Sequence, residues 1–314
     1  MKLSFVVPCF NEEENINRFY EEVNKTFCGL VPDYEIVFVN DGSTDKTGEE
    51  LKKLYACDSS RVQVLTFSRN FGKEAAMYAG ISKARGELVC IIDADLQQHP
   101  SVVVEMLKEM GEDSSVDCVA AYQANRKEGK AISGVKSLFY KLINKMADVD
   151  FVNGASDFRL MKRPMVDAII SMSEAHRFSK GIFSWVGFNT KYIPYEVNER
   201  EFGETKWSLW KLIKYAIDGV VSFSTLPLKL SMGVGLTTSA ASIIYLLVVI
   251  IQKLFFGIDV PGYATIVVLV LFLGGMQLFC LGILGEYISK IFIQSKNRPI
   301  YILKEHLVED DEKG

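Results

Sequence analysis

The stretch Arg85–Pro100 reads RGELVCIIDADLQQHP, and it places a short apolar run directly before two aspartates, Asp93 and Asp95. The run Leu88–Ile92 has the continuous hydrophobicity of a strand that is buried on both faces of a parallel sheet. On an extended chain, residues i and i+2 point to the same side, so both carboxylates can approach one divalent cation. The stretch therefore predicts a strand that ends in a site for Mg²⁺ or Mn²⁺.

Similar apolar runs recur along the first part of the chain, and helical patterns separate them. The further strands are predicted at Leu3–Val7, Glu35–Val39, Val62–Phe67 and Asp117–Ala121. Alternating strands and helices indicate an α/β fold with a mainly parallel sheet covered on both faces. Ligands of such sheets bind beyond the carboxyl ends of the strands. Those ends are polar here, with Asp41 after one strand and Ser68–Lys73 after the next.

The composition excludes some classes of partner. The chain has 314 residues, with 39 acidic and 35 basic side chains and a net charge of −4. A nucleic-acid-binding protein should be basic, so we expect no nucleic-acid partner. The six cysteines show no Cys-x-x-Cys spacing, which favours reduced cysteines in the core of a cytoplasmic domain over disulfides or zinc. The apolar stretch at the N-terminal end is too short for a signal peptide, so we expect a protein that is not secreted.

Two intervals in the last third of the chain contain no charged residue. One lies between Lys229 and Lys253, and the other between Asp259 and Glu286. Each is long enough for a helix across about 30 Å of hydrocarbon, which needs about 20 residues. A pair of buried core helices is the alternative, although soluble helices rarely run so far without charge. The prediction is a hairpin of two membrane helices, at about 230–252 and 262–285.

Basic residues flank this hairpin on both sides, among them Lys229 before it and Lys290 after it. By the positive-inside rule, both flanks are expected in the cytoplasm. Residues 206–223 carry apolar side chains at spacings of three and four, with Trp and Lys at the start. This pattern is typical of a helix that lies in the membrane interface, and an ordinary amphipathic helix packed on the soluble domain is the alternative.

Several motifs together resemble the glycosyltransferases of family 2 that act on polyprenyl phosphate. The resemblance runs from about residue 3 to about residue 295, is strongest to the bactoprenol glucosyltransferases, and extends more distantly to the dolichyl-phosphate mannose synthases. The motifs that carry it are VVPCFNEEENI, EIVFVNDGSTDKT, FSRNFGKEAA, RGELVCIIDADLQQHP, GASDFRLMKRP, FSKGIFSWVGF and ETKWSLWKLIKYAIDGVVSFST.

The resemblance implies a Rossmann-like glycosyltransferase-A fold, followed by interfacial helices and a two-helix transmembrane hairpin. Residues 1–204 would form the cytoplasmic catalytic domain and 205–229 the juxtamembrane helical region. The hairpin would occupy 230–288, and 289–314 would be a cytoplasmic tail. The protein would then be a multi-pass component of the bacterial inner membrane, with its catalytic domain and both termini in the cytoplasm. A homo-oligomer is also expected.

The resemblance also assigns roles to individual residues. Asp157 matches the position of the catalytic base, and Asp95 is expected to take part in the chemistry. The metal would be held by Asp93, Asp95 and Gln97. The nucleotide pocket would comprise Pro8, Phe10, Glu12, Asp41, Asn70, Lys73, Asp93 and Ala94, with Gly72 at its border. The acceptor phosphate would meet Arg126, Arg200 and Lys206.

The implied reaction is an inverting transfer of glucose from UDP-glucose to undecaprenyl phosphate, with Mg²⁺ or Mn²⁺ as cofactor. The alternative donors are GDP-mannose, a UDP-N-acetylhexosamine and a UDP-linked modified arabinose. A lipid-translocating subunit without enzymatic activity and a processive polysaccharide synthase are further alternatives; the synthase would need more membrane helices and a Gln-x-x-Arg-Trp motif. Because the acceptor phosphate is mostly ionised at neutral pH, our hypothesis is that Asp157 orients groups rather than removing a proton.

Overall fold

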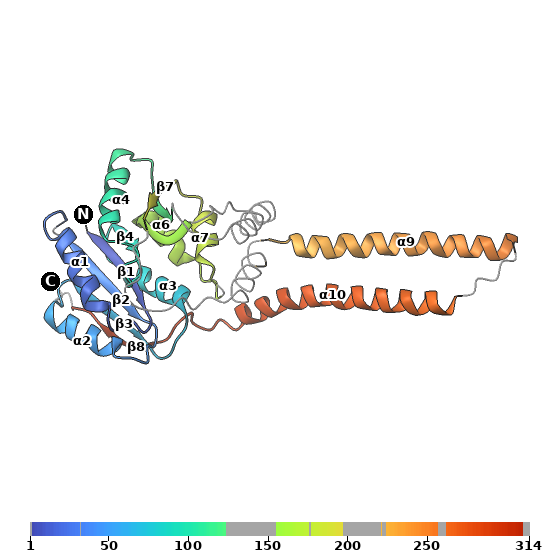
Figure 1. The fold of residues 1–314 in the computed structure, drawn as a ribbon, viewed down its shortest axis with the longest axis horizontal. Coiled ribbons are helices and arrows are strands. Elements are labelled where there is room, and N and C mark those ends of the chain that lie inside the picture. The colour runs from blue at the N-terminus through green and yellow to red at the C-terminus, as the bar shows by residue number, and fades with distance from the viewer. Residues whose placement is uncertain are drawn as a thin grey trace.

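The structure is a computed structural model that describes residues 2–31, 33–123, 155–175, 177–196, 221, 224–256 and 262–309. A sheet with helices on both faces forms one part of the molecule, and two long helices extend away from it side by side (Figure 1). Apart from residue 221, the predicted interfacial helix at 206–223 lies outside the described residues.

The sheet contains eight strands, in the spatial order β7-β5-β6-β4-β1-β2-β3-β8. Six of them run in one direction, while β6 and β8 run against their neighbours. The predicted mainly parallel sheet is therefore confirmed. The strand bounds are β1 Leu3–Cys9, β2 Tyr34–Asn40, β3 Val62–Phe67, β4 Leu88–Ile91, β5 Cys118–Gln123, β6 Ala155–Lys162, β7 Thr190–Tyr195 and β8 Leu303–Leu307.

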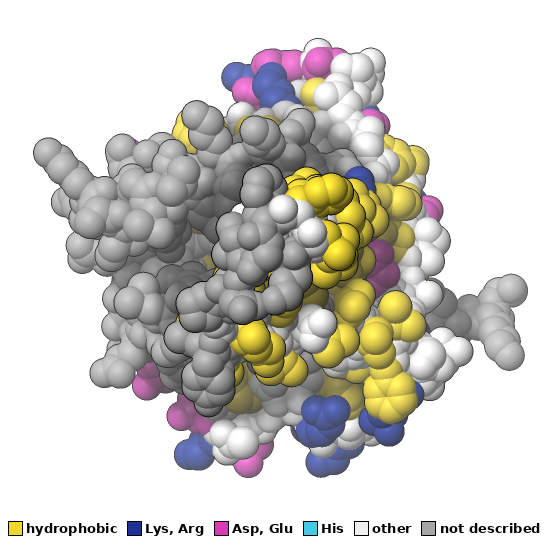
Figure 2. All heavy atoms as spheres, turned by 90° about the vertical axis from the view of Figure 1, so that its right-hand side faces the viewer, with side chains coloured by type: hydrophobic (Ala, Val, Ile, Leu, Met, Phe, Trp, Pro, Cys, Tyr) yellow, Lys and Arg dark blue, Asp and Glu magenta, His cyan; other side chains and the backbone are white. Residues whose placement is uncertain are grey.

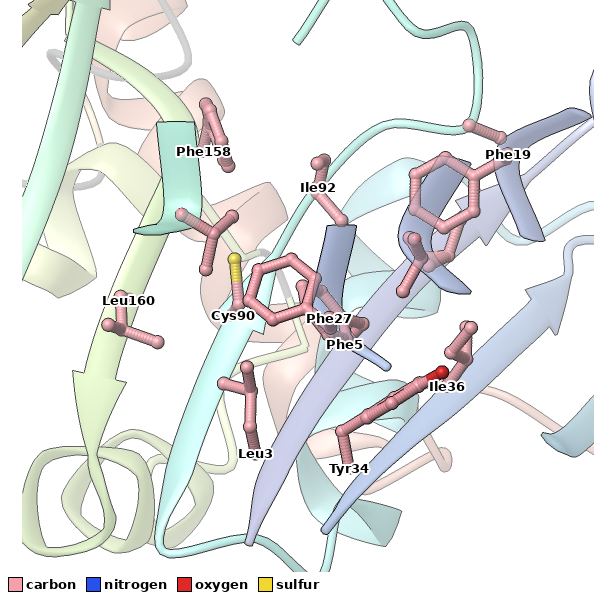
Figure 3. Packing of buried hydrophobic residues seen from close by; sticks show 14 of the residues in the cluster. Leu3, Phe5, Phe19, Phe27, Tyr34, Ile36, Cys90, Ile92, Phe158 and Leu160 are labelled. Carbon is pink, nitrogen blue, oxygen red and sulfur yellow. The ribbon is translucent and has the colours of Figure 1, made fainter. Parts of the chain in front are cut away.

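Two hydrophobic layers hold the helices against the sheet. One face carries α1 (Ile16–Phe27), α2 (Thr47–Cys57) and α4 (Ser101–Glu112). Its core includes the rings of Phe5, Phe27 and Tyr34, with Phe5 and Phe27 edge to face at 5.0 Å between centroids (Figure 3). The other face carries α3 (Lys73–Lys83), α6 (Arg163–Ser171) and α7 (Ser179–Trp185).

Small residues let α3 lie very close to the sheet. Ala75, Ala76 and Ala79 are buried, and a Cβ added at Gly80 would come within 2.3 Å of Val6 Cγ1. Because α3 begins directly after the loop that follows β3, this close packing fixes its first residue, Lys73, at the carboxyl edge of the parallel strands. The close packing of α3 on the sheet therefore positions Lys73 at the strand ends, where ligands of such sheets bind.

The two long helices are α9 (Leu226–Phe256) and α10 (Tyr263–Ser295). They contain apolar stretches at Leu226–Gln252 and Val268–Ser295 that are long and apolar enough to cross a membrane, and neither stretch is buried in the protein. This exposure counts against the alternative of two core helices. Figure 2 shows the molecule from the right-hand side of Figure 1, the end toward which α9 and α10 extend. In the described part of this surface, hydrophobic side chains gather toward the middle and most charged side chains lie toward the rim.

Strand β8 lies within residues 289–314, which were expected to form a tail and for which no strand was predicted. After α10 the chain returns to the sheet, where β8 pairs antiparallel with β3 and Lys52 forms an ion pair with Glu305 at 2.8 Å. The segment alternates half-buried and exposed side chains, so its apolar signal is weak. Its pairing depends on a strand about 240 residues earlier, which local patterns do not reveal.

The cysteines are all free thiols. Cys9, Cys90 and Cys118 are buried in the core, as expected. Cys28 and Cys57 are exposed, because each lies at or just beyond the last turn of a surface helix. The expectation of core cysteines therefore holds for only part of the set.

Candidate active site

The candidate site lies at the carboxyl edge of the parallel strands. Asp41 directly follows β2, and Asp93 and Asp95 follow β4. Asp157 reaches the same edge by another route: β6 runs antiparallel to β4, so its beginning, rather than its end, lies beside the end of β4. One reversed strand thus brings residue 157 next to residue 93.

Lys73 joins two of the predicted carboxylates. Its ammonium Nζ lies 2.6 and 2.9 Å from the two carboxylate oxygens of Asp93, and 3.4 Å from Oδ2 of Asp157. The Lys73 side chain is 45% exposed, whereas those of Asp93 and Asp157 are 29% and 20% exposed. The Lys73 side chain is therefore half-exposed along its length, while its ammonium bridges two largely enclosed carboxylates.

The charges of this cluster set the ionisation of its members. Burial alone would raise the pKa of Asp157, but Lys73, Lys180 and Arg159 outweigh it and hold that pKa below its ordinary value. For Lys73, burial would lower the pKa of the ammonium, and Asp93 and Asp157 reverse this so that it lies above its ordinary value. Both groups are thus charged at neutral pH.

The residues after β4 form a tight turn around their own carboxylates. Gln98 donates from Nε2 to Asp93 at 3.3 Å and accepts from the Asp93 backbone N–H at 3.1 Å. Asp95 accepts the backbone N–H of Gln97 at 3.2 Å, and Leu96 between them has a φ of 55°. The structure thus gives Gln98, not predicted, the direct contact with Asp93, and Ala94 is buried beneath the turn.

The donor set of this turn fits a hard divalent cation. Asp93, Asp95 and Gln97 offer oxygen atoms, which Mg²⁺ and Mn²⁺ prefer. Within the described ranges, no group of three or more His, Cys, Asp and Glu side chains gathers around one point. The Lys73 ammonium bound to Asp93 shows that this carboxylate accommodates positive charge.

Asp41 fixes the loop that precedes α3. Its carboxylate is almost fully buried and accepts the backbone N–H groups of Phe71 at 2.7 Å and Gly72 at 2.9 Å. Burial raises the pKa of Asp41 above its ordinary value, and these two hydrogen bonds oppose the rise. Beside it, Gly42 has a φ of 65° and lies against the backbone of Arg69 and Asn70, so that Asn70 borders the same point.

The loop after β1 is linked to the loop after β2. Asn11 accepts the backbone N–H of Thr44 at 2.9 Å, and the Glu12 backbone N–H donates to Thr47 at 2.8 Å. Pro8 is half-buried within β1, and the ring of Phe10 is 43% exposed at the edge. These contacts hold Phe10 and Glu12 on the side of the site that Asp41 occupies.

Two further functional candidates lie beside these residues, and only Glu74 was not considered from the sequence. Glu74 follows Lys73 and accepts the backbone N–H of Ser179 at 3.0 Å as well as the Ser179 hydroxyl. Burial, reinforced by the charge of Asp157, raises the pKa of Glu74 to about 7. Arg159 is buried, lies 3.5 Å over the ring of Phe183 and donates to the Ser156 carbonyl at 2.9 Å. Glu74 could have been predicted as a site residue from the sequence, because it directly follows Lys73 in the first turn of a helix.

The predicted acceptor-phosphate residues cannot be placed. Arg126, Arg200 and Lys206 lie outside the described residues. The described part of the site therefore comprises the carboxylate cluster around Lys73 and the loops held by Asp41 and Asn11.

Comparisons with known proteins agree with this architecture. Residues 4–170 match the family described as glycosyl transferase family 2, and residues 226–291 match the GtrB C-terminal hairpin. The protein belongs to glycosyl transferase family 2 and is a glycosyltransferase.

The sequence similarity to its relatives extends over nearly the whole chain. It is 46% identical to CsbB of Bacillus subtilis (strain 168), covering 96% of this chain and 91% of that protein. It is 43% identical to the bactoprenol glucosyl transferase of Shigella phage SfV, covering 97% and 98%. Among solved structures, the glucosyl-3-phosphoglycerate synthase of Mycobacterium tuberculosis with Mn²⁺, UDP-glucose and phosphoglyceric acid has 17% identity and a TM-score of 0.45, over 70% of this chain and 77% of that chain.

Proposed function

We propose that this glycosyltransferase moves glucose from UDP-glucose to the phosphate of a polyprenyl lipid, undecaprenyl phosphate, and releases UDP. The observation that carries the proposal is the charged cluster of Lys73, Asp93 and Asp157 in a chain that also bears a membrane-length helical hairpin. The 43% identity over nearly the full length to a protein named bactoprenol glucosyl transferase supports the lipid acceptor and the glucose donor.

The donor would bind across the strand ends. Glu12 would accept N–H and O–H groups of the nucleoside, Asp41 would do so with the lone pairs that its bonds to Phe71 and Gly72 leave, and the exposed side chain of Phe10 offers a surface for the base. The diphosphate would lie toward Asp93 and Asp95. A Mg²⁺ or Mn²⁺ ion held there by Asp93, Asp95 and Gln97 would neutralise charge on the leaving diphosphate. Lys73, which is paired with Asp93 in the absence of the donor, would bind the same diphosphate.

Asp157 would act by orientation. The acceptor phosphomonoester has a second pKa of about 6, so at neutral pH it is mostly a dianion and needs no base to become nucleophilic. A free carboxylate beside that dianion would repel it, but Asp157 is paired with Lys73 at 3.4 Å. In the proposed inverting displacement, Asp157 keeps the Lys73 ammonium beside the reacting groups, and positioning with charge neutralisation supplies most of the rate.

The membrane hairpin would bring the lipid phosphate to this site. Because β8 belongs to the same sheet as β1, the chain leaves and rejoins one domain on either side of α9 and α10. Lys290, Lys296 and Arg298 near the end of α10 favour the cytoplasmic side of a bacterial inner membrane for that domain. Arg126, Arg200 and Lys206 remain the predicted contacts of the acceptor phosphate.

A donor panel tests this proposal. Detergent-purified protein with undecaprenyl phosphate and Mg²⁺ or Mn²⁺ is offered UDP-glucose, UDP-N-acetylglucosamine, UDP-galactose and GDP-mannose, and both glycolipid and released nucleotide are measured. We expect glucolipid from UDP-glucose alone, absent in Asp95→Asn. Turnover of another donor would replace glucose in the proposal, and lipid-independent release of nucleotide from every donor would refute the acceptor.

A further inference from the structure

The segment that connects α10 to β8 contacts the loop Ser68–Gly72, which we call the donor loop. The Ser68 backbone N–H donates to the Ile302 carbonyl at 3.0 Å. The ring of Tyr301 stacks on that of Phe67, with centroids 5.0 Å apart and planes inclined by 13°. Phe67 ends β3, so the donor loop begins at a point that the C-terminal segment holds through both backbone and side chain.

The same contacts continue into the donor loop. The Phe71 ring meets Phe67 edge to face at 5.7 Å, and the Arg69 guanidinium lies 4.0 Å over the Phe71 ring. Phe71 and Gly72 are the residues whose backbone N–H groups bind Asp41. The rings of Phe67 and Phe71 thus connect Tyr301 to the backbone N–H groups that bind the Asp41 carboxylate.

On its other side, Tyr301 reaches α3. Its ring lies 6.3 Å from the ring of Tyr78, and the Tyr78 hydroxyl donates to the Ile170 carbonyl at 3.2 Å. The Tyr78 ring is also covered by the Arg177 guanidinium at 4.3 Å. Tyr301 therefore packs between Phe67, the residue directly before the donor loop, and Tyr78 on α3, the helix that begins directly after that loop.

The end of α10 is fixed to the domain just before this segment. The Gln294 side chain accepts the Ala175 backbone N–H at 2.8 Å and donates to the Ser173 carbonyl at 3.4 Å. Gln294 at the end of α10 and Tyr301, seven residues further along the chain, are therefore both held against the same domain.

We propose that Tyr301 is a positioning residue for the donor: its ring holds Phe67, and through Phe67 the ring of Phe71, so that the Phe71 and Gly72 N–H groups remain on Asp41, and it links the seating of α10 to the donor pocket. The inference rests on the proposed function where it takes the ligand at Asp41 to be a nucleoside diphosphate sugar. It gives the C-terminal segment a role in substrate binding, in addition to membrane attachment.

The test compares full-length protein in detergent with three variants, Tyr301→Ala, Tyr301→Phe and Leu307→Ala. Leu307 lies on β8, which follows Tyr301 in the chain, and packs against the core on the opposite face of the sheet, so its loss weakens β8 without touching the aromatic contacts. Two readouts are made: hydrogen exchange of peptides covering residues 68–72 without ligand, and the affinity for UDP by calorimetry.

We expect Tyr301→Ala to accelerate exchange in the donor loop and to weaken UDP binding, each by about 3- to 10-fold, the range of one lost aromatic contact. Tyr301→Phe keeps the ring and should match the original protein in both. Equal behaviour of Tyr301→Ala and Leu307→Ala would overturn the inference. If the unsubstituted protein does not bind UDP, accelerated exchange in Tyr301→Ala alone still supports the positioning role, and the proposed donor is what fails.

Discussion

Gly42→Ala should damage the donor side of the site through the backbone alone. Gly42 has a φ of 65°, where an L-residue costs about 1–2 kcal/mol. The added Cβ would lie 2.4 Å from the Arg69 carbonyl carbon and 2.5 Å from the Asn70 nitrogen, so the loop must move. Movement strains two hydrogen bonds to the buried Asp41 carboxylate, each worth about 1.5–3 kcal/mol. We expect a total loss of about 2–4 kcal/mol in unfolding free energy.

Thermal unfolding and UDP binding in one detergent measure this effect. A loss of that size should lower Tm by about 5–15 °C, and UDP affinity should fall by at least about tenfold. Gly72→Ala isolates backbone strain, since Gly72 has a φ of 96° but nothing within 4 Å of an added Cβ. Gly111→Ala has neither a positive φ nor a contact and should be close to neutral. If Gly42→Ala lowers Tm no more than Gly72→Ala and binds UDP normally, the close approach to Arg69 does not hold the loop and the reasoning is refuted.

The charged cluster leads to the remaining predictions. Lys73→Met should lower kcat/KM for glucolipid formation by at least about 100-fold, because it removes the cation between Asp93 and Asp157; a loss below tenfold would contradict its role. Asp157→Asn should lose activity equally across about pH 6–8.5, and recovery of the rate at high pH would instead identify a proton-transfer role. Burial raises the pKa of Glu74 from 4.5 to about 7, so the folded protein retains a proton that the unfolded chain releases, and stability should fall as pH rises through this window. Glu74→Gln should therefore gain stability relative to the original protein, by at most about 3 kcal/mol, between about pH 5 and pH 8 in thermal unfolding, and a pH-independent difference would exclude this titration. EDTA should abolish glucolipid formation, Mg²⁺ or Mn²⁺ should restore it, and full activity after chelation would refute metal dependence.

The sequence predicts the first five strands well because their apolar runs are continuous, and helical patterns of apolar residues mark the four helices between them. Strand β6 escaped prediction because its inward positions include Asp157 and the buried Arg159, which interrupt the apolar pattern. Strand β7 alternates only weakly, and β8 depends on distant pairing with β3. A hydrophobic pattern depends only on residues close together in the sequence. Strands β6, β7 and β8 form because they pair with strands that are distant in the sequence, so the pattern does not reveal them.

The candidate site shows the same division. The carboxylates after β2 and β4 were predicted individually, since polar residues at strand ends are visible in the sequence. The ion pairs of Lys73 with Asp93 and Asp157 were not, because they depend on the direction of β6 and the close seating of α3. The hydrogen bonds between Asp93 and Gln98 close a turn in which Leu96 has a positive φ, a conformation that no pattern of residue types announces.

The return of β8 to the sheet has a consequence for the order of assembly. β8 follows the two long helices in the chain but pairs with β3, with Val64 opposite Leu307. During synthesis, the apolar helices are made before the strand that covers this edge of the sheet. The edge of β3 stays open until the hairpin has been made, and only then can Tyr301 stack on Phe67. The support that Tyr301 gives to Phe67 is thus among the last contacts available to the growing chain, and a chain cut short after the hairpin would lack it.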